Sequence, residues 1–319
     1  ATTSVLSSNG GTPLATHALP HSSRPYGIAY SDVNDVVYVT LQGTGELVEV
    51  DRSGGVTNIV AVSPGTGAIV PQLRGIAISG DGGRILVTQF VSTDEKGRVY
   101  EVSAASFAVT RTFDLAFDLI GPDAEDGGRG VPNYLSGIAI SPDGLTALVP
   151  SKQDNLARGM FRDSQTLNFE TMVRPIVSSL DLVGNVENLA GRVDLDDRNM
   201  PQSIRFSPSG DIYFVAIQGN NLVEFFDATD GSRFGGVSTG LAPVGMVMSS
   251  DASRLFVHNY MSRSVSVFDV NDVVSGVGNT GVLLAEVNTV DSEALSDEVL
   301  QGKQIFYNAD DLRMSKDAY

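Results

Sequence analysis

Apolar and polar positions repeat one two-strand pattern five times along the chain. Each copy begins with Gly-apolar-Ala-apolar-Ser or a close variant, passes through a turn and continues into a second apolar run. The copies cover 27–40, 75–88, 137–151, 203–216 and 245–258. A pattern that recurs in this way indicates stacked supersecondary units rather than one irregular domain.

Two further strands are predicted in each repeat. The third strand alternates apolar and polar residues and ends in Asp, as in 46–51, 222–227 and 264–269, and a looser fourth strand follows, as in 282–287. Four antiparallel strands form one blade of a propeller, and neighbouring blades supply the core that a single blade lacks. The sequence therefore predicts an all-β fold, a β-propeller of four-stranded antiparallel blades with five legible repeats.

The two ends of the chain depart from the repeat. Residues 2–19 read as two weak strands, comparable to the outer strands of a blade whose inner strands are missing. After Val290 the pattern predicts a short amphipathic helix with Ser296 as N-cap and with Leu295 and Leu300 at the spacing of a hydrophobic staple. We therefore expect a propeller over 1–290 and a helical linker over 291–319.

Charge and composition narrow the classes of partner. The net charge is −17, which argues against nucleic acids and anionic membranes, because phosphate contacts need clustered Lys and Arg. A basic partner protein fits this charge, and so does a simple role in solubility. The chain has no cysteine, which excludes disulfides and thiolate chemistry within it, and no apolar run approaches the ~18 residues of a membrane helix.

Candidate binding residues come from positions that the repeat brings to one end of a propeller channel. They lie just before the inner strands or just after the second strands, and such a polar, convergent set is a reasonable binding site. The alternative is that they only solvate the channel and tie blades together. The set includes Arg24, Arg74, Gln89, Gln218, His258 and Asn259.

The second and third repeats are longer than the others, with predicted insertions at 121–129 and 151–174. Long loops inside a compact repeat are often functional. The second of these insertions could be a docking loop for a partner domain. It could also be a surface loop whose salt bridges contribute little to stability. Its charged and polar residues include Lys152, Asp154, Asn155 and Arg158.

Other chemistry has weaker signals. His258 is the only histidine within the repeats, and it could be a general base or a hydrogen-bonded structural residue. Calcium could bind at 32–35 or 194–197, although ordinary acidic turns explain both segments. The letters of G-x-G-x-x-G occur at 276–281, but they lead into a strand rather than a helix, so a dinucleotide site is not expected.

Over 24–290 the repeats resemble those of the YVTN β-propeller family of surface-layer and lactonase-like proteins. That family usually has seven blades. Three segments, 149–155, 257–267 and 300–307, are similar to bacterial propellers fused to c-type cytochromes of the di-haem peroxidase (MauG-like) type. In those proteins a Gly-Lys-x-Ile/Leu-Phe-Tyr motif, here 302–307, and an Arg-Met-Ser segment, here 313–315, precede the first haem-binding Cys-x-x-Cys-His.

These resemblances imply a non-catalytic binding or scaffold module of a secreted bacterial redox protein, periplasmic or extracellular. Its partners would be the c-type cytochrome domain of the same polypeptide, begun at 291–319, and an electron-transfer partner protein. Haem c is expected only in that downstream domain, because no Cys-x-x-Cys-His occurs here. Two alternatives stay open: a small-molecule hydrolase of lactonase type, and a carbohydrate- or surface-binding propeller, which the lack of tryptophan disfavours.

Overall fold

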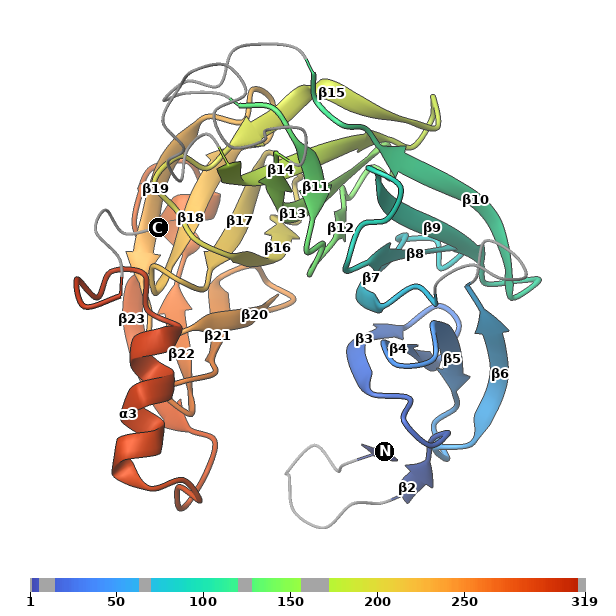
Figure 1. Cartoon of the computed structure of the whole chain (residues 1–319), viewed down its shortest axis with the longest axis horizontal. Helices are drawn as coiled ribbons and strands as arrows, with labels where there is room; N and C mark the ends of the chain where they lie inside the picture. Colours follow the sequence, from blue (N-terminus) through green and yellow to red (C-terminus); the bar gives the residue numbers. More distant parts are fainter. Residues whose placement is uncertain (1, 6–14, 63–69, 120–127, 156–171, 315–319) are drawn as a thin grey trace.

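Five antiparallel sheets follow one another around an arc (Figure 1). The computed structural model describes residues 2–5, 15–62, 70–119, 128–155 and 172–314. Each sheet is one blade, with its strands in chain order, and the inner strands of successive blades contact one another from blade one to blade five. The expectation of an all-β propeller is confirmed.

The blades are numbered in chain order, and each runs outward from its inner strand. Blade one contains β3 (Pro25–Ser31), β4 (Val36–Leu41), β5 (Glu46–Val50) and β6 (Val56–Ala61). Blade two contains β7 (Leu73–Ile78), β8 (Arg84–Gln89), β9 (Gly97–Ser103) and β10 (Ala108–Leu115). Blade three contains β11 (Val131–Asn133), β12 (Ala139–Ile140), β13 (Thr146–Asp154), β14 (Val173–Asp181) and β15 (Val186–Asp194). Blade four contains β16 (Pro201–Phe206), β17 (Ile212–Ile217), β18 (Leu222–Asp227) and β19 (Arg233–Ser238). Blade five contains β20 (Pro243–Met248), β21 (Arg254–Asn259), β22 (Ser264–Asp269) and β23 (Val282–Asn288).

Blade three corrects the prediction that an insertion begins at Ser151. Strand β13 continues to Asp154, because the extra strand β11 pairs with its last three residues on one side and β14 pairs with it on the other. Lys152 and Asp154 are therefore strand residues and not loop residues. The rest of this predicted loop, 156–171, and most of the other predicted insertion lie outside the described residues.

The glycine that begins a repeat is required by the close approach of two neighbouring inner strands. A Cβ atom at Gly27 would lie 2.1 Å from the carbonyl oxygen of Arg74 in the next blade. At Gly75 it would lie 2.8 Å from the carbonyl carbon of Gly137. These separations are too short for any side chain, so the repeat begins with glycine where two inner strands touch.

A threonine in the second strand links neighbouring blades. Thr88 Oγ1 accepts a hydrogen bond from the N–H of Gly75 at 2.8 Å and donates to the carbonyl of Leu135 in blade three at 2.7 Å. Thr40 does the same between Gly27 and the carbonyl of Arg74, at 2.8 and 2.9 Å. One side chain thus satisfies two buried main-chain groups from different strands.

The serine that follows the first strand of a repeat closes the turn after it. Ser79 Oγ donates to Asp81 and accepts from the N–H of Arg84 at 2.9 Å. The same arrangement recurs at Ser249, whose hydroxyl donates to Asp251 at 2.6 Å and accepts from the N–H of Arg254. Such side-chain bonds to a turn backbone explain why serine and aspartate stand at these positions.

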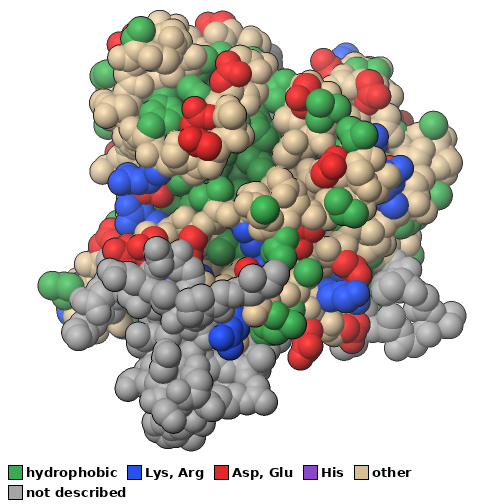
Figure 2. Space-filling model, turned by 90° about the horizontal axis from the view of Figure 1, so that it is seen from above, with side chains coloured by type: hydrophobic (Ala, Val, Ile, Leu, Met, Phe, Trp, Pro, Cys, Tyr) green, Lys and Arg blue, Asp and Glu red, His purple; other side chains and the backbone are tan. Residues whose placement is uncertain are grey.

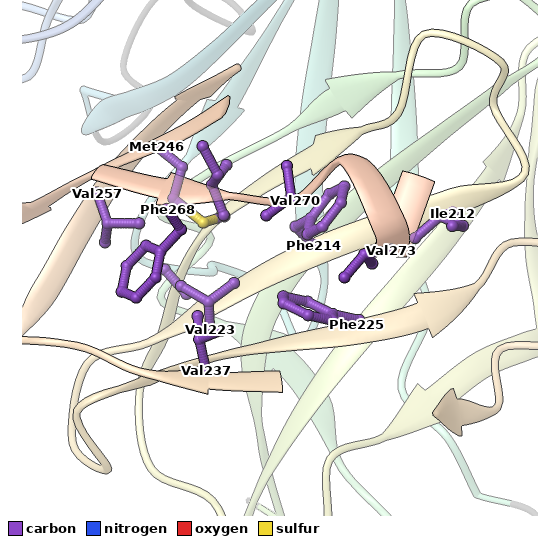
Figure 3. Packing of buried hydrophobic residues seen from close by; sticks show 12 residues of the cluster. Ile212, Phe214, Val223, Phe225, Val237, Met246, Val257, Phe268, Val270 and Val273 are labelled. Atoms are coloured by element: carbon purple, nitrogen blue, oxygen red, sulfur yellow. The ribbon is translucent and has the colours of Figure 1, made fainter. Parts of the chain in front are cut away.

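The hydrophobic core lies between the blades rather than within them. Between blades four and five, Phe214 and Phe225 meet edge to face with centroids 5.1 Å apart, and Met246, Val257 and Phe268 of blade five pack in the same cluster (Figure 3). Fully burying one such side chain is worth about 1.5–3 kcal/mol. Each blade therefore depends on its neighbours for stability.

The two ends of the arc, blades one and five, stand apart in Figure 1. On β3, Ile28 and Tyr30 flank Ala29, which packs toward blade two, and they are 67% and 53% exposed on the opposite side. On β20, Val247 is 58% exposed, and every residue of β23 is exposed. The two terminal blades therefore present apolar side chains of the kind that the three middle blades bury.

The N-terminal residues form the expected pair of strands, β1 (Thr2–Val5) with β2 (Ala15–Ala18). Leu19, which follows β2, packs against Val39 and Val48 on the outward face of blade one. This contact covers the middle of that face and leaves its inner strand exposed.

The C-terminal region contains a short helix α2 (Asn271–Val274) and the predicted helix α3 (Asp297–Phe306). The hydroxyl of Ser296 accepts a hydrogen bond from the N–H of Val299, which confirms the expected N-cap. Neither helix in the described part of the chain has the length and apolar character needed to cross a bilayer.

Candidate functional site

Five side chains from blades one to three form a single stack of aromatic rings and cations. The guanidinium carbon of Arg74 lies 4.4 Å from the ring centroid of Tyr26 and 3.3 Å from that of Phe90. Phe90 stacks on Tyr134 with centroids 4.6 Å apart, and the ammonium of Lys152 lies 4.1 Å from the Tyr134 centroid. Each cation faces an electron-rich ring, which is a favourable arrangement. We call these five residues the aromatic stack.

The repeat explains why the aromatic stack forms. Tyr26 and Arg74 each precede the first glycine of a repeat, so they lie at the same level of adjacent inner strands. Phe90 directly follows β8, and its main chain bonds to Gln72 and Leu135 at 2.7 and 3.1 Å. These bonds fix its ring between blades two and three.

Arg74 has few partners for its hydrogen-bond donors. One terminal nitrogen donates weakly to the hydroxyl of Tyr26 at 3.5 Å, and the buried Nε has no hydrogen-bond partner. Among the described residues, no carboxylate lies within 4.0 Å of Arg74. Burial lowers the pKa of Arg74, while Tyr26, Tyr134 and Tyr307 act in the opposite direction. An arginine remains protonated even so, and within the described residues its charge has no carboxylate counter-ion.

Lys152, at the other end of the aromatic stack, is already neutralised. Its ammonium lies 3.0 Å from Asp154 Oδ1, and Asn133 Nδ2 donates to Asp154 Oδ2 at 2.6 Å. Asp154 and Asn155 are both almost fully buried. These residues thus form an internal polar network at the end of β13.

Three of the candidate amides are buried within the propeller. Gln89 accepts from the hydroxyl of Tyr100 at 2.8 Å, and Gln218 accepts from Gln202 at 2.9 Å. Asn259 is fully buried and donates to the hydroxyls of Ser264 and Ser266, at 3.1 and 2.8 Å. Bonded in this way, the amides join neighbouring strands.

Two other candidates lie away from the aromatic stack. Arg24 is exposed, has a positive φ of 48° and uses its carbonyl to accept from the N–H of Gln42 at 3.0 Å. His258 lies on β21 opposite Gly245 and Val265, and its side chain is exposed. Partial burial first, and the positive charge of Arg263 second, lower the pKa of His258. Arg158 lies outside the described residues.

A hydrolytic site is not assembled around His258 in the described part of the chain, where it has no carboxylate partner. No cluster of three or more His, Cys, Asp or Glu residues able to hold a metal ion occurs in the described ranges. In the segments considered for calcium, Asp35 accepts from Tyr30 and Arg52, and Asp194 accepts from Arg174. On the face of the molecule shown in Figure 2, basic side chains lie beside acidic ones.

The segment after the propeller is fixed at the same end of the channel. Tyr307 packs edge to face on Tyr260 with centroids 6.1 Å apart, and Lys303 lies 5.6 Å from the same ring. The N–H of Ala309 donates to the carbonyl of Gly219 at 2.7 Å. The side chains of Asn220 and Asn221 donate to Asp310 and Asn308, at 2.9 and 2.8 Å. This segment is therefore packed on the loops that follow the second strands of blades four and five.

Sequence reasoning selected Arg74 and Lys152 but missed the aromatic residues that position them. Tyr26, Phe90 and Tyr134 each lie one or two residues from a strand end, at positions that the aligned repeats place near the axis. Aligning the residue before each inner strand and the residue after each second strand would have found two of them.

A cavity of about 540 Å³ lies elsewhere, between blades three and four. Its lining includes Tyr213, whose hydroxyl is buried without a hydrogen-bond partner, with Asp143, Asp230 and Arg192. None of the candidate residues from the sequence belongs to it.

Comparison with known proteins identifies the architecture. No family model and no curated relative matches the chain. A protein of unknown function from Desulfotomaculum acetoxidans is 18% identical over 89% of this chain and 76% of its own, with a TM-score of 0.58. A putative 6-phosphogluconolactonase from Bacteroides uniformis is 15% identical over 82% of this chain and 70% of its own, with a TM-score of 0.52. Hydrazine synthase of Kuenenia stuttgartiensis is 16% identical over 88% of this chain and 90% of its own, with a TM-score of 0.49. Identities this low show the fold alone, so the chain is a β-propeller whose activity must be argued from its own residues.

Proposed function

We propose that this propeller is a non-catalytic scaffold that holds a c-type cytochrome domain of the same polypeptide at its channel mouth. The observation that supports this proposal is the placement of Tyr307, the last residue of the Gly302–Tyr307 motif, against Tyr260. The motif resembles the lead-in to a cytochrome domain, and its end is packed on the loops of blades four and five. A domain that follows this segment would therefore begin at the mouth.

The contacts of the segment suit a fixed attachment rather than a loose linker. Three hydrogen bonds, made by Asn220, Asn221 and Ala309, act together with the Tyr260–Tyr307 contact within a stretch of a few residues. The main-chain bond to Gly219 also fixes the path of the chain as it leaves α3. Several such contacts together restrict the orientation of whatever is attached, which is what a redox partner domain requires.

The haem would belong to the attached domain. Covalent haem c needs two cysteine thiols, and this chain contains none, so its residues do not fit a haem c site. In this proposal the polypeptide works in the bacterial periplasm or outside the cell, and a second redox protein docks beside the cytochrome domain.

The experiment compares two adjacent aromatic residues in the natural polypeptide. Replacing Tyr307 with alanine removes the contact with Tyr260, whereas replacing Phe306, which is 71% exposed, serves as the matched control. Small-angle scattering should show a larger radius of gyration for Tyr307→Ala and an unchanged one for Phe306→Ala. Equal behaviour of the two variants, or the absence of a haem domain, would overturn the proposal.

A further inference from the structure

Arg74 is a cation without a carboxylate partner among the described residues, in a protein with a net charge of −17. Two other buried arginines of the described residues have close carboxylates: Arg192 lies 2.7 Å from Glu187, and Arg174 lies 2.5 Å from Asp194. Arg74 instead contacts two aromatic rings and keeps a buried Nε without a hydrogen-bond partner. From this contrast we infer that Arg74 anchors a binding site at the channel mouth for a small organic carboxylate.

A partly buried guanidinium without an acceptor is costly, and a carboxylate would remove that cost. Donors that lose water need hydrogen bonds in return, and charged donors need them most. The rings of Tyr26 and Phe90 hold the guanidinium plane but offer it only a weak hydrogen bond, at 3.5 Å. Arg74 is half-buried, so it remains accessible to a ligand from solvent.

The charges nearby favour a carboxylate over a phosphate. A planar guanidinium held against two aromatic rings is already oriented for the two parallel hydrogen bonds that a carboxylate accepts. The second cation of the aromatic stack, Lys152, is neutralised by Asp154 at 3.0 Å. One uncompensated positive charge matches a monoanion, whereas a phosphate dianion would leave negative charge unmatched.

The surroundings also indicate the body of the ligand. The ring of Tyr26 contacts Arg74, the ring of Tyr134 stacks on Phe90 beside it, and both tyrosines carry hydroxyls. Aromatic side chains around a single charged anchor suit a ligand with a flat or apolar body. The same chemistry could come from a free aromatic acid or from a glutamate side chain of a partner protein.

The test uses the 319-residue chain labelled with ¹⁵N-arginine and follows its side-chain Nε–H signals by NMR. Benzoate is the probe, and benzamide, which has the same shape without the charge, is the control ligand. N-acetyl-glutamate amide represents a protein side chain. We expect benzoate to shift the Arg74 signal saturably with a Kd of about 1 mM, and benzamide to have no such effect.

Two variants separate binding from folding. Arg74→Gln should weaken benzoate binding at least ~10-fold, and Arg74→Lys, which keeps the charge but not the planar fork, should weaken it by less. Arg84→Gln, at an arginine paired with Glu101 3.8 Å away, should leave it unchanged. Tighter binding of benzoate than of the glutamate amide would indicate a free small molecule, and equal binding would indicate a protein carboxylate. Shifts that do not saturate, that benzamide reproduces, or that persist in a folded Arg74→Gln variant would overturn the inference.

Discussion

Thr40 Oγ1 donates a hydrogen bond of 2.9 Å to the main-chain carbonyl of Arg74, across the boundary between blades one and two. Thr88 makes the equivalent bond to Leu135, across the next boundary. The threonine near the end of the second strand of these repeats therefore has a structural role, since it joins one blade to the next. The same bonds fix the inner strand that carries Arg74.

Replacing Thr88 with valine should destabilise the protein by about 2–4 kcal/mol. Valine has a similar shape but leaves the N–H of Gly75 and the carbonyl of Leu135 buried without partners. Thr57→Val is the control, because Thr57 is exposed and bonds only to Glu49. Urea unfolding gives both values, and similar losses for the two variants would contradict this role for Thr88.

Replacing Gly75 with alanine should cost about 1–3 kcal/mol, because its Cβ would meet Gly137 at 2.8 Å. Gly245 occupies the same position in the last repeat and has no atom within 4 Å of its Cβ position. Gly245→Ala should therefore be neutral or slightly stabilising. Thermal unfolding of the two variants decides the matter, and equal melting temperatures would refute the close-approach argument.

Arg205 is the third residue of its repeat, where other repeats have a small residue such as Ala77. Its side chain donates a hydrogen bond to the carbonyl of Ile204 at 2.9 Å. Burial lowers the pKa of Arg205. Replacing it with methionine should leave stability unchanged or raise it by about 1 kcal/mol, since a poorly compensated charge is removed. Arg174→Met should instead cost about 2–4 kcal/mol, because it breaks the pair with Asp194. Denaturant midpoints test both, and a strongly destabilised Arg205→Met would show that this charge has a partner.

Acid should weaken the turns that the repeated serines close. Hydrogen bonds from the hydroxyl of Ser249 and from Ser253 lower the pKa of Asp251 from 3.8 to about 2. A carboxyl with a lower pKa in the folded state stabilises the fold above its unfolded pKa and loses that contribution as the pH falls toward the folded pKa. Asp251→Asn should therefore flatten the pH dependence of the melting temperature between pH 4 and pH 2. An unchanged slope would contradict the assignment.

The fold could be predicted from sequence because each residue of the repeated two-strand pattern makes its contacts within its own repeat or with the neighbouring one. Glycine marks close approach at Gly27 and Gly75, and serine closes a turn at Ser79. The extension of β13 to Asp154 could not be predicted, because it depends on pairing with β11, a strand that the repeated pattern does not contain.

The site was predicted only in part. Convergence on the axis pointed to Arg74, but it could not distinguish this uncompensated charge from Gln89, which is buried and bonded to Tyr100. The rings of Tyr26 and Phe90 come from different repeats, and no local sequence pattern predicts that both contact one guanidinium. Contacts of this kind depend on how the blades pack.

The central claim is that this propeller holds a c-type cytochrome domain of its own polypeptide, and covalent haem is its most direct test. The natural polypeptide that contains this chain should be purified, denatured and run on a gel stained for haem. The account predicts a haem-stained band at the size of the intact polypeptide, and a Cys-x-x-Cys-His in its sequence after Tyr319. A polypeptide without covalent haem and without that motif would contradict it.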